Sequence, residues 1–384
     1  MAENPYFHRG PVRDRKFFFG RTAETQEILS CVHRRQSVSI VGPRRIGKTS
    51  LLLHLADPEV RAVYDLGDDH VFVYIDCQAL SGSLTESDVY RELLAGVVTV
   101  TQGVHRVERG SRESMTYLDF GRSLEQIVAP DLRIVFMFDE FEEIAGNGHL
   151  GRSFFNELRG LGQTDKVVYV TASTETLSDL TFHNQIVLSS PFFNVFYPVW
   201  LGFVNSEEAR ALVDDQASMV GFDGFDESDH AFLRETAGLH PFYLQVACYY
   251  LFEEKAKATG LTVPDYGQVR RQFAREARGH FRYAWTRLSY DEQERLKMIC
   301  ERRLGELSSG DLERLEQRCL VYQGEIFSSA FAEFVLNWNA PESESAGPTP
   351  RPTSENERTE GAYPTIHAAW KISGVLLLLV LSLG

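Results

Sequence analysis

The sequence predicts an α/β fold with a parallel sheet, followed by an all-helical region and then by a small region of helices and one hairpin. Three observations predict this order. Short apolar runs alternate with helix-length segments over residues 22–204, which is the pattern of a parallel sheet whose strands are connected by helices. Strand patterns then stop between residues 206 and 281. Finally, a hairpin pattern centred on Gln323-Gly324 stands between two predicted helices.

Five apolar runs are expected to form the strands of the sheet. Each is rich in β-branched or aromatic residues and is too short for a typical buried helix. The continuous run Ile134–Phe138 is typical of a central strand that is covered on both faces. The predicted strands are residues 37–41, 71–75, 134–138, 167–172 and 194–201, and the predicted helices start at Thr22 and Thr49 and cover 87–98, 117–128 and 152–161.

The second half of the chain is expected to be helical and to end in a winged helix. Ser289 and Glu292 have the spacing of a capping box, which marks the start of a helix. A shorter helix, the hairpin and a last helix follow, and this order is the outline of a winged helix. The other predicted helices in this half are residues 207–219, 227–236, 243–258, 310–317 and 329–337.

Composition places limits on the function. The chain carries 54 acidic and 39 basic side chains, a formal net charge of −15, which argues against a protein that coats nucleic acid. Its 384 residues suffice for two or three domains. The five cysteines lie far apart without a C-x-x-C pair, so they indicate neither a zinc site nor a disulfide scaffold. The first residues lack the apolar stretch of a signal peptide.

A phosphate-binding motif follows the first predicted strand. Residues 42–49 match G-x-x-x-x-G-K-[ST] at every fixed position, between a strand and a helix start. Glycine lets such a loop turn its N–H groups toward phosphate oxygens, and the start of the next helix favours the same negative charge. Lys48 is expected to reach the β- and γ-phosphates, and the Thr49 hydroxyl to ligate Mg²⁺. The expected phosphate-binding residues are Gly42, Pro43, Arg44, Arg45, Ile46, Gly47, Lys48, Thr49 and Ser50.

Two carboxylates directly follow the predicted strand 134–138. A buried parallel strand delivers such residues to the carboxyl edge of the sheet, where ligands bind in open α/β folds. Asp139 is therefore expected to hold the Mg²⁺ shell, and Glu140 to orient and polarise the attacking water. Glu142 and Glu143 are alternative bases, although both also fit a solvated helix face.

Two weaker candidates lie further along the chain. A polar side chain of the run Thr171-Ala172-Ser173-Thr174 could sense the γ-phosphate from the neighbouring strand, or simply cap a helix. Arg159 could stabilise transition-state charge in a neighbouring subunit. A surface arginine at a helix end is the simpler interpretation of Arg159.

With these motifs the chain resembles AAA-type P-loop ATPases and, more narrowly, the STAND class of signal-transduction ATPases and its prokaryotic AAA-like relatives. The N-terminal residues Asn4-Pro5-Tyr6, Arg9–Val12 and Phe18–Arg21 are similar to that group's N-terminal signature. Gly238–Phe242 is similar to its lid motif. The resemblance covers roughly residues 4–338.

The resemblance implies a sheet of order 5-1-4-3-2, followed by a helical lid and a winged helix. It implies that Gly20 and Arg21 lie near the adenine or ribose, that His240 and Pro241 contact the nucleotide from the lid, and that the cofactors are ATP or ADP with Mg²⁺. The predicted domains are an N-terminal segment (1–21), the ATPase core (22–204), the lid (205–281) and the winged helix (282–338). Composition adds a linker (339–365) and a hydrophobic segment (366–384).

The hydrophobic end has three interpretations. Residues 372–383 would form a helix of roughly 18 Å, whereas a bilayer core is about 30 Å thick. The segment could be a short membrane anchor, the first part of a span in a longer chain, or a helix that packs on the protein. The Pro-, Ser- and Glu-rich linker before it disfavours the third. Lys371 at its N-terminal side favours a cytoplasmic ATPase body anchored at its C-terminus.

The charge on the winged helix argues against nucleic acid as a partner. Residues 308–320 mix three acidic with two basic side chains, whereas the arginine-rich run 270–287 fits nucleic acid, an acidic partner or a solvated helix face. We therefore predict an ATP-binding and ATP-hydrolysing signal-transduction switch that self-associates on ATP binding and acts on an unknown protein partner. The alternatives are a DNA-associated ATPase and a non-hydrolysing, nucleotide-locked membrane scaffold.

Overall fold

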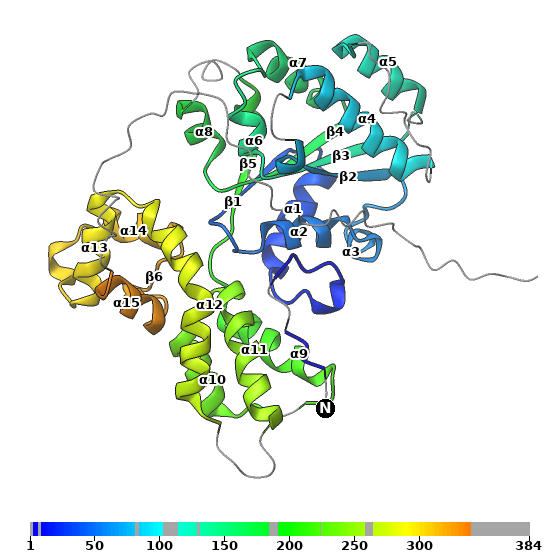
Figure 1. Ribbon diagram of the computed structural model, residues 1–384. Coiled ribbons are helices and arrows are strands. Elements are labelled where there is room, and N and C mark those ends of the chain that lie inside the picture. The colour runs from blue at the N-terminus through cyan, green and yellow to red at the C-terminus, as the bar shows by residue number, and fades with distance from the viewer. Residues whose placement is uncertain are drawn as a thin grey trace, which may run out of the picture. The chain divides into compact units, whose positions relative to one another are not determined.

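The computed structural model describes residues 3–6, 9–80, 84–102, 114–127, 129, 131–183, 191–222, 224–257 and 264–338 (Figure 1). All of them belong to one compact unit, Met1–Trp338. The predicted linker and hydrophobic end, residues 339–384, lie outside the described residues, so membrane attachment stays a prediction. Within the described ranges, none of the helices combines the length and the apolar character that a membrane span requires.

The centre of the structure is a five-stranded parallel sheet. Its order is β2-β3-β4-β1-β5, which confirms the predicted order 5-1-4-3-2. The register aligns Asp76 with Asp139 and Val41 with both Ser173 and Trp200. The carboxyl ends of all five strands therefore share one edge. The strands are β1 (Val38–Val41), β2 (His70–Asp76), β3 (Arg133–Asp139), β4 (Val167–Ser173) and β5 (Tyr197–Trp200).

Helices cover both faces of the sheet, so the central strands are almost entirely buried. Because side chains alternate along a strand, Val135 of β3 joins one apolar core and Phe136 joins the other. The first core is completed by α1 (Thr22–His33), α2 (Lys48–Ala56) and α3 (Pro58–Ala62), and the second by α4 (Glu86–Gln102), α5 (Tyr117–Ile127), α6 (Glu142–Ala145), α7 (Arg152–Gly162) and α8 (Leu177–His183).

Helices and a hairpin follow the sheet, as predicted. The Ser289 side chain and the Glu292 side chain cap each other's backbone N–H groups, which confirms the capping box. One helix differs from expectation: α12 (Tyr266–Thr286) runs across residue 282, where we had placed the start of the winged helix. The remaining elements are α9 (Ser206–Ser218), α10 (Glu227–Ala237), α11 (Pro241–Lys257), α13 (Tyr290–Cys300), α14 (Ser309–Gln317), β6 (Val321–Tyr322), β7 (Glu325–Ile326) and α15 (Ser329–Leu336).

The helices α9–α12 and the winged-helix elements share one apolar core. Gly238, at the end of α10, shows how closely they pack. Its φ is +66°, and a Cβ there would lie 2.1 Å from the carbonyl oxygen of Phe327, so only glycine fits. The Ser328 hydroxyl also donates to the Thr236 carbonyl, and both residues are buried. These contacts hold the lid region and the winged helix together.

The first described residues of the N-terminal segment are attached to the lid region. The Asn4 side chain donates to the Tyr249 carbonyl, and the buried Tyr6 hydroxyl donates to the Val213 carbonyl. The Gln216 side chain donates to the Pro5 carbonyl at 2.6 Å. The chain therefore starts on α9 and α11 and then crosses to the sheet domain at α1.

Candidate active site

The loop between β1 and α2 is shaped by local backbone constraints. Gly47 has φ +105° and Arg45 has φ +70°, so two residues of this six-residue loop adopt the left-handed region. Position 42 requires glycine for another reason: the Cβ of any other residue would lie 2.8 Å from the Leu201 carbonyl oxygen. The helix α2 starts at Lys48, so its unpaired N–H groups point into the loop.

Lys48 lies inside this loop. The residue is 5 % exposed, and its ammonium group donates to the carbonyls of Gly42 at 2.8 Å and Pro43 at 3.2 Å. Burial lowers the pKa of Lys48, and the nearby Glu140 carboxylate opposes that shift. The positive charge is therefore held among loop carbonyls, where an anionic ligand of the loop would meet it.

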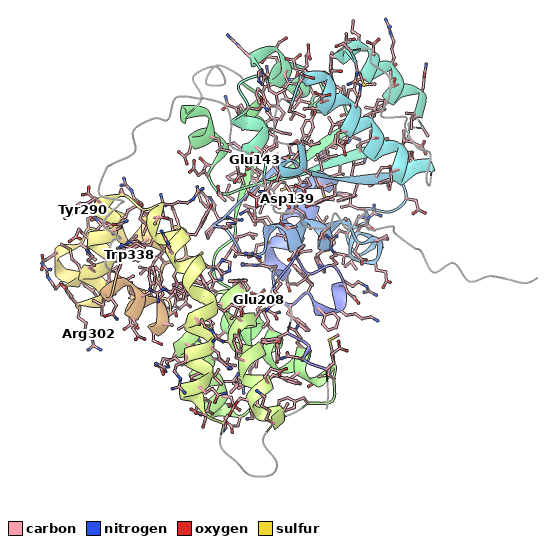
Figure 2. The ribbon with its side chains drawn as sticks, viewed as in Figure 1. Asp139, Glu143, Glu208, Tyr290, Arg302 and Trp338 are labelled. Carbon is pink, nitrogen blue, oxygen red and sulfur yellow. The ribbon has the colours of Figure 1, made fainter. Side chains whose placement is uncertain are left out.

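Asp139 ends β3 at the carboxyl edge of the sheet (Figure 2). Its side chain is almost fully buried and accepts hydrogen bonds from the Tyr74 hydroxyl at 2.8 Å and from the Glu140 backbone N–H at 3.1 Å. Burial, and then the Asp139 charge, raise the pKa of Tyr74. Tyr74 therefore stays a neutral donor that orients the carboxylate.

Glu140 has an unusual backbone for its residue type. Its φ is +51°, a conformation that costs an L-residue of this kind about 1–3 kcal/mol and that persists mainly where function requires it. Burial raises the pKa of Glu140, the neighbouring Glu142 adds to that shift, and Lys48 opposes it. A carboxylate with a raised pKa beside a lysine is a typical candidate for acid–base work.

The predicted alternative bases are placed differently. Glu142 accepts hydrogen bonds from the backbone N–H of Thr174 at 3.1 Å and from its hydroxyl at 2.8 Å. Glu143 is exposed (Figure 2). The Thr174 side chain is thus engaged with Glu142. Among the preceding strand residues, Ser173 donates to the Glu175 carbonyl, and the buried Thr171 hydroxyl has no partner among the described residues.

A cavity of about 300 Å³ brings most of the predicted residues together. Lys48, Glu140 and Pro241 line it, as do the N-terminal segment and α9 and α11 of the lid region. The Val12 backbone N–H donates to the Ser50 hydroxyl at 3.0 Å, which ties the N-terminal segment to the loop. We call this space the nucleotide cavity; the predicted site residues that line it are Arg21, Arg44, Arg45, Ile46, Gly47, Lys48, Thr49, Ser50, Glu140 and Pro241.

Arg21 has a role that the sequence did not reveal. Its buried guanidinium donates to Glu24 at 2.8 Å and to the carbonyls of Ile46 at 3.2 Å and Gly202 at 2.6 Å. Its backbone N–H donates to Glu208 at 2.8 Å. Glu208 lies where the lid region meets the sheet domain (Figure 2) and also caps the start of α9. Arg21 therefore connects the phosphate-binding loop, the strand edge and the lid.

Six predicted site residues do not line the nucleotide cavity. Gly42 and Pro43 line a second cavity, described below, and Asp139 ends the strand directly before Glu140. The other three are Gly20, His240 and Arg159. Gly20 packs against Glu208, with a hypothetical Cβ 3.1 Å from that side chain, and does not line the cavity. His240 is buried; burial, aided by the Arg21 charge, lowers its pKa to about 3, so its ring is neutral. Arg159 lies on α7 and lines neither of the cavities described here.

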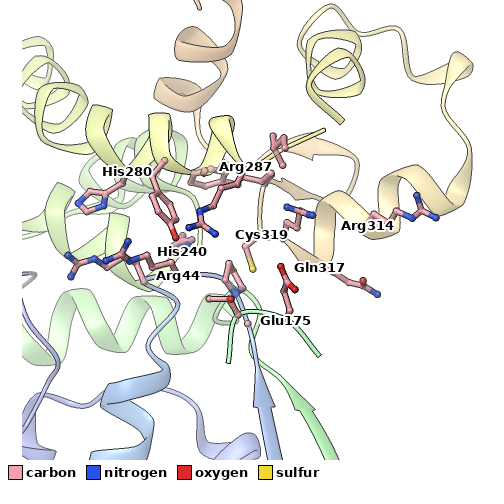
Figure 3. Close-up of a pocket in the computed structure, with 18 of the residues that line it drawn as sticks. Arg44, Glu175, His240, His280, Arg287, Arg314, Gln317 and Cys319 are labelled. Atoms are coloured by element: carbon pink, nitrogen blue, oxygen red, sulfur yellow. The ribbon is translucent and has the colours of Figure 1, made fainter. Parts of the chain in front are cut away.

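A second cavity, of about 560 Å³, also borders the phosphate-binding loop, and Figure 3 shows it in close-up. It is lined by loop residues, the ends of β4 and β5, α12 and the winged helix, and His240 is part of its wall. The guanidinium carbons of Arg44 and Arg287 lie 4.8 Å and 4.5 Å from the ring centroid of Tyr283. We call this space the coupling cavity. Several of its residues, among them Arg44, His240 and Arg287, stand out in the sequence, but the cavity itself does not.

Comparisons with known proteins agree with this geometry. A family model described as Novel STAND NTPase 2 matches residues 27–302. The Walker-type ATPase PABY2304 of Pyrococcus abyssi is similar in structure (TM-score 0.59, 16 % identity, 85 % of this chain and 99 % of that one). So is the ORC2 protein of Aeropyrum pernix in its ADPNP–ADP complexes (TM-score 0.54, 14 % identity, 85 % and 89 %). These two likenesses show the fold. No curated protein sequence matches.

Proposed function

Because the chain belongs to the Novel STAND NTPase 2 family, we propose that it binds ATP with Mg²⁺, hydrolyses it, and uses the nucleotide state to set the position of its lid and winged helix. One observation carries the proposal: Lys48, Thr49 and Glu140 line the same cavity, and Asp139 ends the strand that delivers Glu140. Phosphate-binding, metal-binding and water-orienting groups thus occupy one site.

The residues present fit a magnesium ion. Mg²⁺ prefers oxygen ligands and keeps several of its waters, so it needs only one or two protein groups. The Thr49 hydroxyl lines the cavity, and the Asp139 carboxylate is oriented by Tyr74. When bound, the ion would neutralise charge on the phosphate oxygens. Thr49 and Asp139 would hold it, either directly or through water.

Glu140 would orient the attacking water. It lines the cavity, it is half-buried, and Lys48 lies near enough to affect its pKa. Its carboxylate can accept a proton from water as the bond to the γ-phosphate forms. The raised pKa makes the ionised form of Glu140 a better base than that of an ordinary glutamate.

The switch part of the proposal depends on two connections. Arg21 links the phosphate-binding loop to Glu208 at the start of the lid. Arg44, in the same loop, lies over Tyr283 of α12, which leads into the winged helix. A change in the loop on nucleotide exchange would therefore reach both regions. On this view α12 belongs to both the lid and the winged helix, because it crosses the predicted boundary between them near residue 282.

The winged helix does not favour DNA as a partner. Its Arg295 pairs with Asp311 at 3.1 Å, and Arg318 pairs with Glu292 at 3.2 Å. On α12, Arg270 pairs with Glu235 at 2.7 Å. Phosphate binding needs arginines that face outward together, and these are occupied by carboxylates. Self-association on ATP binding and a protein partner remain part of the proposal.

Phosphate release from Mg·ATP by the full chain tests the proposed function. The wild type should turn over ATP and bind ADP, and Lys48→Ala should lower nucleotide affinity by about 100-fold or more, because a charge-assisted contact to phosphate is lost. Lys16→Ala is the control, since Lys16 is exposed and lines neither cavity. Unchanged affinity in Lys48→Ala would refute the site assignment.

A further inference from the structure

One side chain in the wall of the nucleotide cavity is incompletely hydrogen-bonded. Gln245, on α11, lines the cavity and is 7 % exposed. Its Oε1 atom is buried and has no hydrogen-bond partner among the described residues. Buried polar atoms are nearly always paired, so an unpaired acceptor in a ligand cavity points to a donor on the ligand.

A chain of hydrogen bonds determines which amide atom of Gln245 is unpaired. The Pro5 carbonyl can only accept, so Gln216 must present its Nε2 to it, at 2.6 Å. The Oε1 of Gln216 then accepts from Nε2 of Gln245, at 2.9 Å. Gln216 is 1 % exposed, so water does not compete. This chain leaves the Oε1 of Gln245, an acceptor, as the group without a partner.

The position of Gln245 fits the base rather than the phosphates. The helix α11 starts at Pro241, and Pro241 and Gln245, four residues apart, lie on one face of it; both line the cavity. The lining of the cavity also includes the apolar or aromatic side chains of Phe18, Leu212 and Phe242. Such surfaces suit a flat ring system. The ring of Phe242 also lies 5.2 Å from the Arg45 guanidinium carbon.

We propose that Gln245 is a specificity-determining residue that accepts a hydrogen bond from the exocyclic amine of adenine. Guanine and hypoxanthine carry an oxygen at the same ring position, so they place an acceptor against an acceptor. Gln216 is then a positioning residue, because it prevents the amide of Gln245 from turning over to offer its Nε2. This inference rests on the proposed function, since it assumes that a nucleotide occupies the cavity.

The test compares ADP with IDP, which differs from ADP at the 6-position of the purine. Equilibrium binding to the full chain with Mg²⁺ should favour ADP by about tenfold or more, since one net hydrogen bond corresponds to about a factor of ten. Gln245→Met keeps the length of the side chain but removes the acceptor. Its ADP to IDP ratio should fall to within about twofold.

Gln245→Met also leaves the Oε1 of Gln216 without its donor, so a second variant is needed. Gln216→Leu keeps Gln245 but frees its amide to turn. We expect this variant to bind ADP and to lose most of its preference over IDP, which a merely structural role would not produce. Gln293→Met is the matched control, because Gln293 lies on α13 and donates to the Trp285 carbonyl.

The outcomes separate the inference from the proposed function. A wild type that binds ADP and IDP equally, or a Gln245→Met variant that keeps the full preference, overturns the role of Gln245 and leaves the nucleotide site intact. A wild type that binds neither nucleotide overturns the proposed function, and this inference with it. Loss of preference in both variants, with none in Gln293→Met, supports the inference.

Discussion

The two cavities that border the phosphate-binding loop are built differently. Arginines and aromatic rings line both cavities. The nucleotide cavity, of about 300 Å³, holds in addition Lys48 and the Glu140 carboxylate of raised pKa, and segments distant in sequence close it. The coupling cavity, of about 560 Å³, is lined by arginines and aromatic rings from α12 and the winged helix. The first arrangement suits chemistry on a phosphate, and the second suits a contact between parts that move.

Arg44 and Arg45 line both cavities, so the loop borders both of them. The side chain of Arg44 lies over Tyr283 in the coupling cavity, yet its charge also affects the pKa of Lys48 and Glu140 in the nucleotide cavity. Arg44 therefore interacts with groups in both cavities. The difference predicts that mutations can affect nucleotide binding and the proposed lid and winged-helix response separately.

The largest effect is expected from Glu140→Gln. If Glu140 orients the attacking water, the variant should bind ATP as the wild type does and hydrolyse it about 100- to 10,000-fold more slowly. Single-turnover phosphate release and ATP binding measure the two properties separately. Glu143→Gln is the control, since Glu143 is exposed. A turnover rate in Glu140→Gln equal to that of the wild type would remove Glu140 from this role.

Arg21→Leu should show that one residue holds the nucleotide cavity together. It removes the three hydrogen bonds of the guanidinium and leaves Glu24 without its pair, whereas the backbone bond to Glu208 can persist. Loss of a partner from a buried ion pair costs about 3 kcal/mol of unfolding free energy. Urea unfolding, with the exposed Arg271→Leu as control, measures it. Equal midpoints for both variants would contradict the assignment.

Tyr283→Leu should affect only the coupling cavity. Two cation–π contacts are lost, worth about 1 kcal/mol of stability in total at exposed arginines. Nucleotide affinity should stay within about threefold of wild type, because Tyr283 does not line the nucleotide cavity. The proposed switch predicts that the wild type differs in protease sensitivity between its ATP-bound and ADP-bound forms. The Tyr283→Leu variant should lose this difference. Tyr290→Leu, on an exposed residue, should keep that difference. A large loss of affinity would refute the separation.

The smallest effect concerns pH. Burial and Glu142 raise the pKa of Glu140, and hydrolysis requires its ionised form. Activity should therefore be full above this raised pKa and fall as the pH drops through it, at a higher pH than for an ordinary glutamate. Glu142→Gln removes the like charge but keeps an acceptor for Thr174, so the acid limb should move to lower pH. An acid limb that stays at the same pH or moves to higher pH would contradict the role of Glu142 in raising the pKa of Glu140.

Local patterns predicted most of the fold. The strands and the phosphate-binding loop depend on short runs of sequence, and all five strands formed within a few residues of the expected positions. The helix α12 was not recognised as one element, although Val269, Phe273, Ala277, Phe281 and Trp285 are buried at a spacing of four residues. The arginines between them make this segment strongly charged, which obscures the apolar periodicity.

The candidate site was predictable only where a motif is continuous. Residues 42–50 and Asp139-Glu140 are contiguous in sequence, and all of them lie around the same loop and strand end. The contacts of Arg21 join Ile46, Gly202 and Glu208, and no local pattern reveals such pairings. The same is true of the chain from Pro5 through Gln216 to Gln245.

Hydrogen exchange of the full chain tests the central claim most directly. The slow hydrolysis of the Glu140→Gln variant keeps it in the ATP-bound form when Mg·ATP is added. Its amide exchange in that form is compared with its exchange in the presence of Mg·ADP. The account predicts that amide exchange over Phe281–Leu288, which carries Tyr283 and Arg287, differs severalfold between the two states, while β3 stays equally protected. Identical exchange over this segment, with both nucleotides bound, would contradict the claim that the phosphate-binding loop couples the nucleotide to the winged helix.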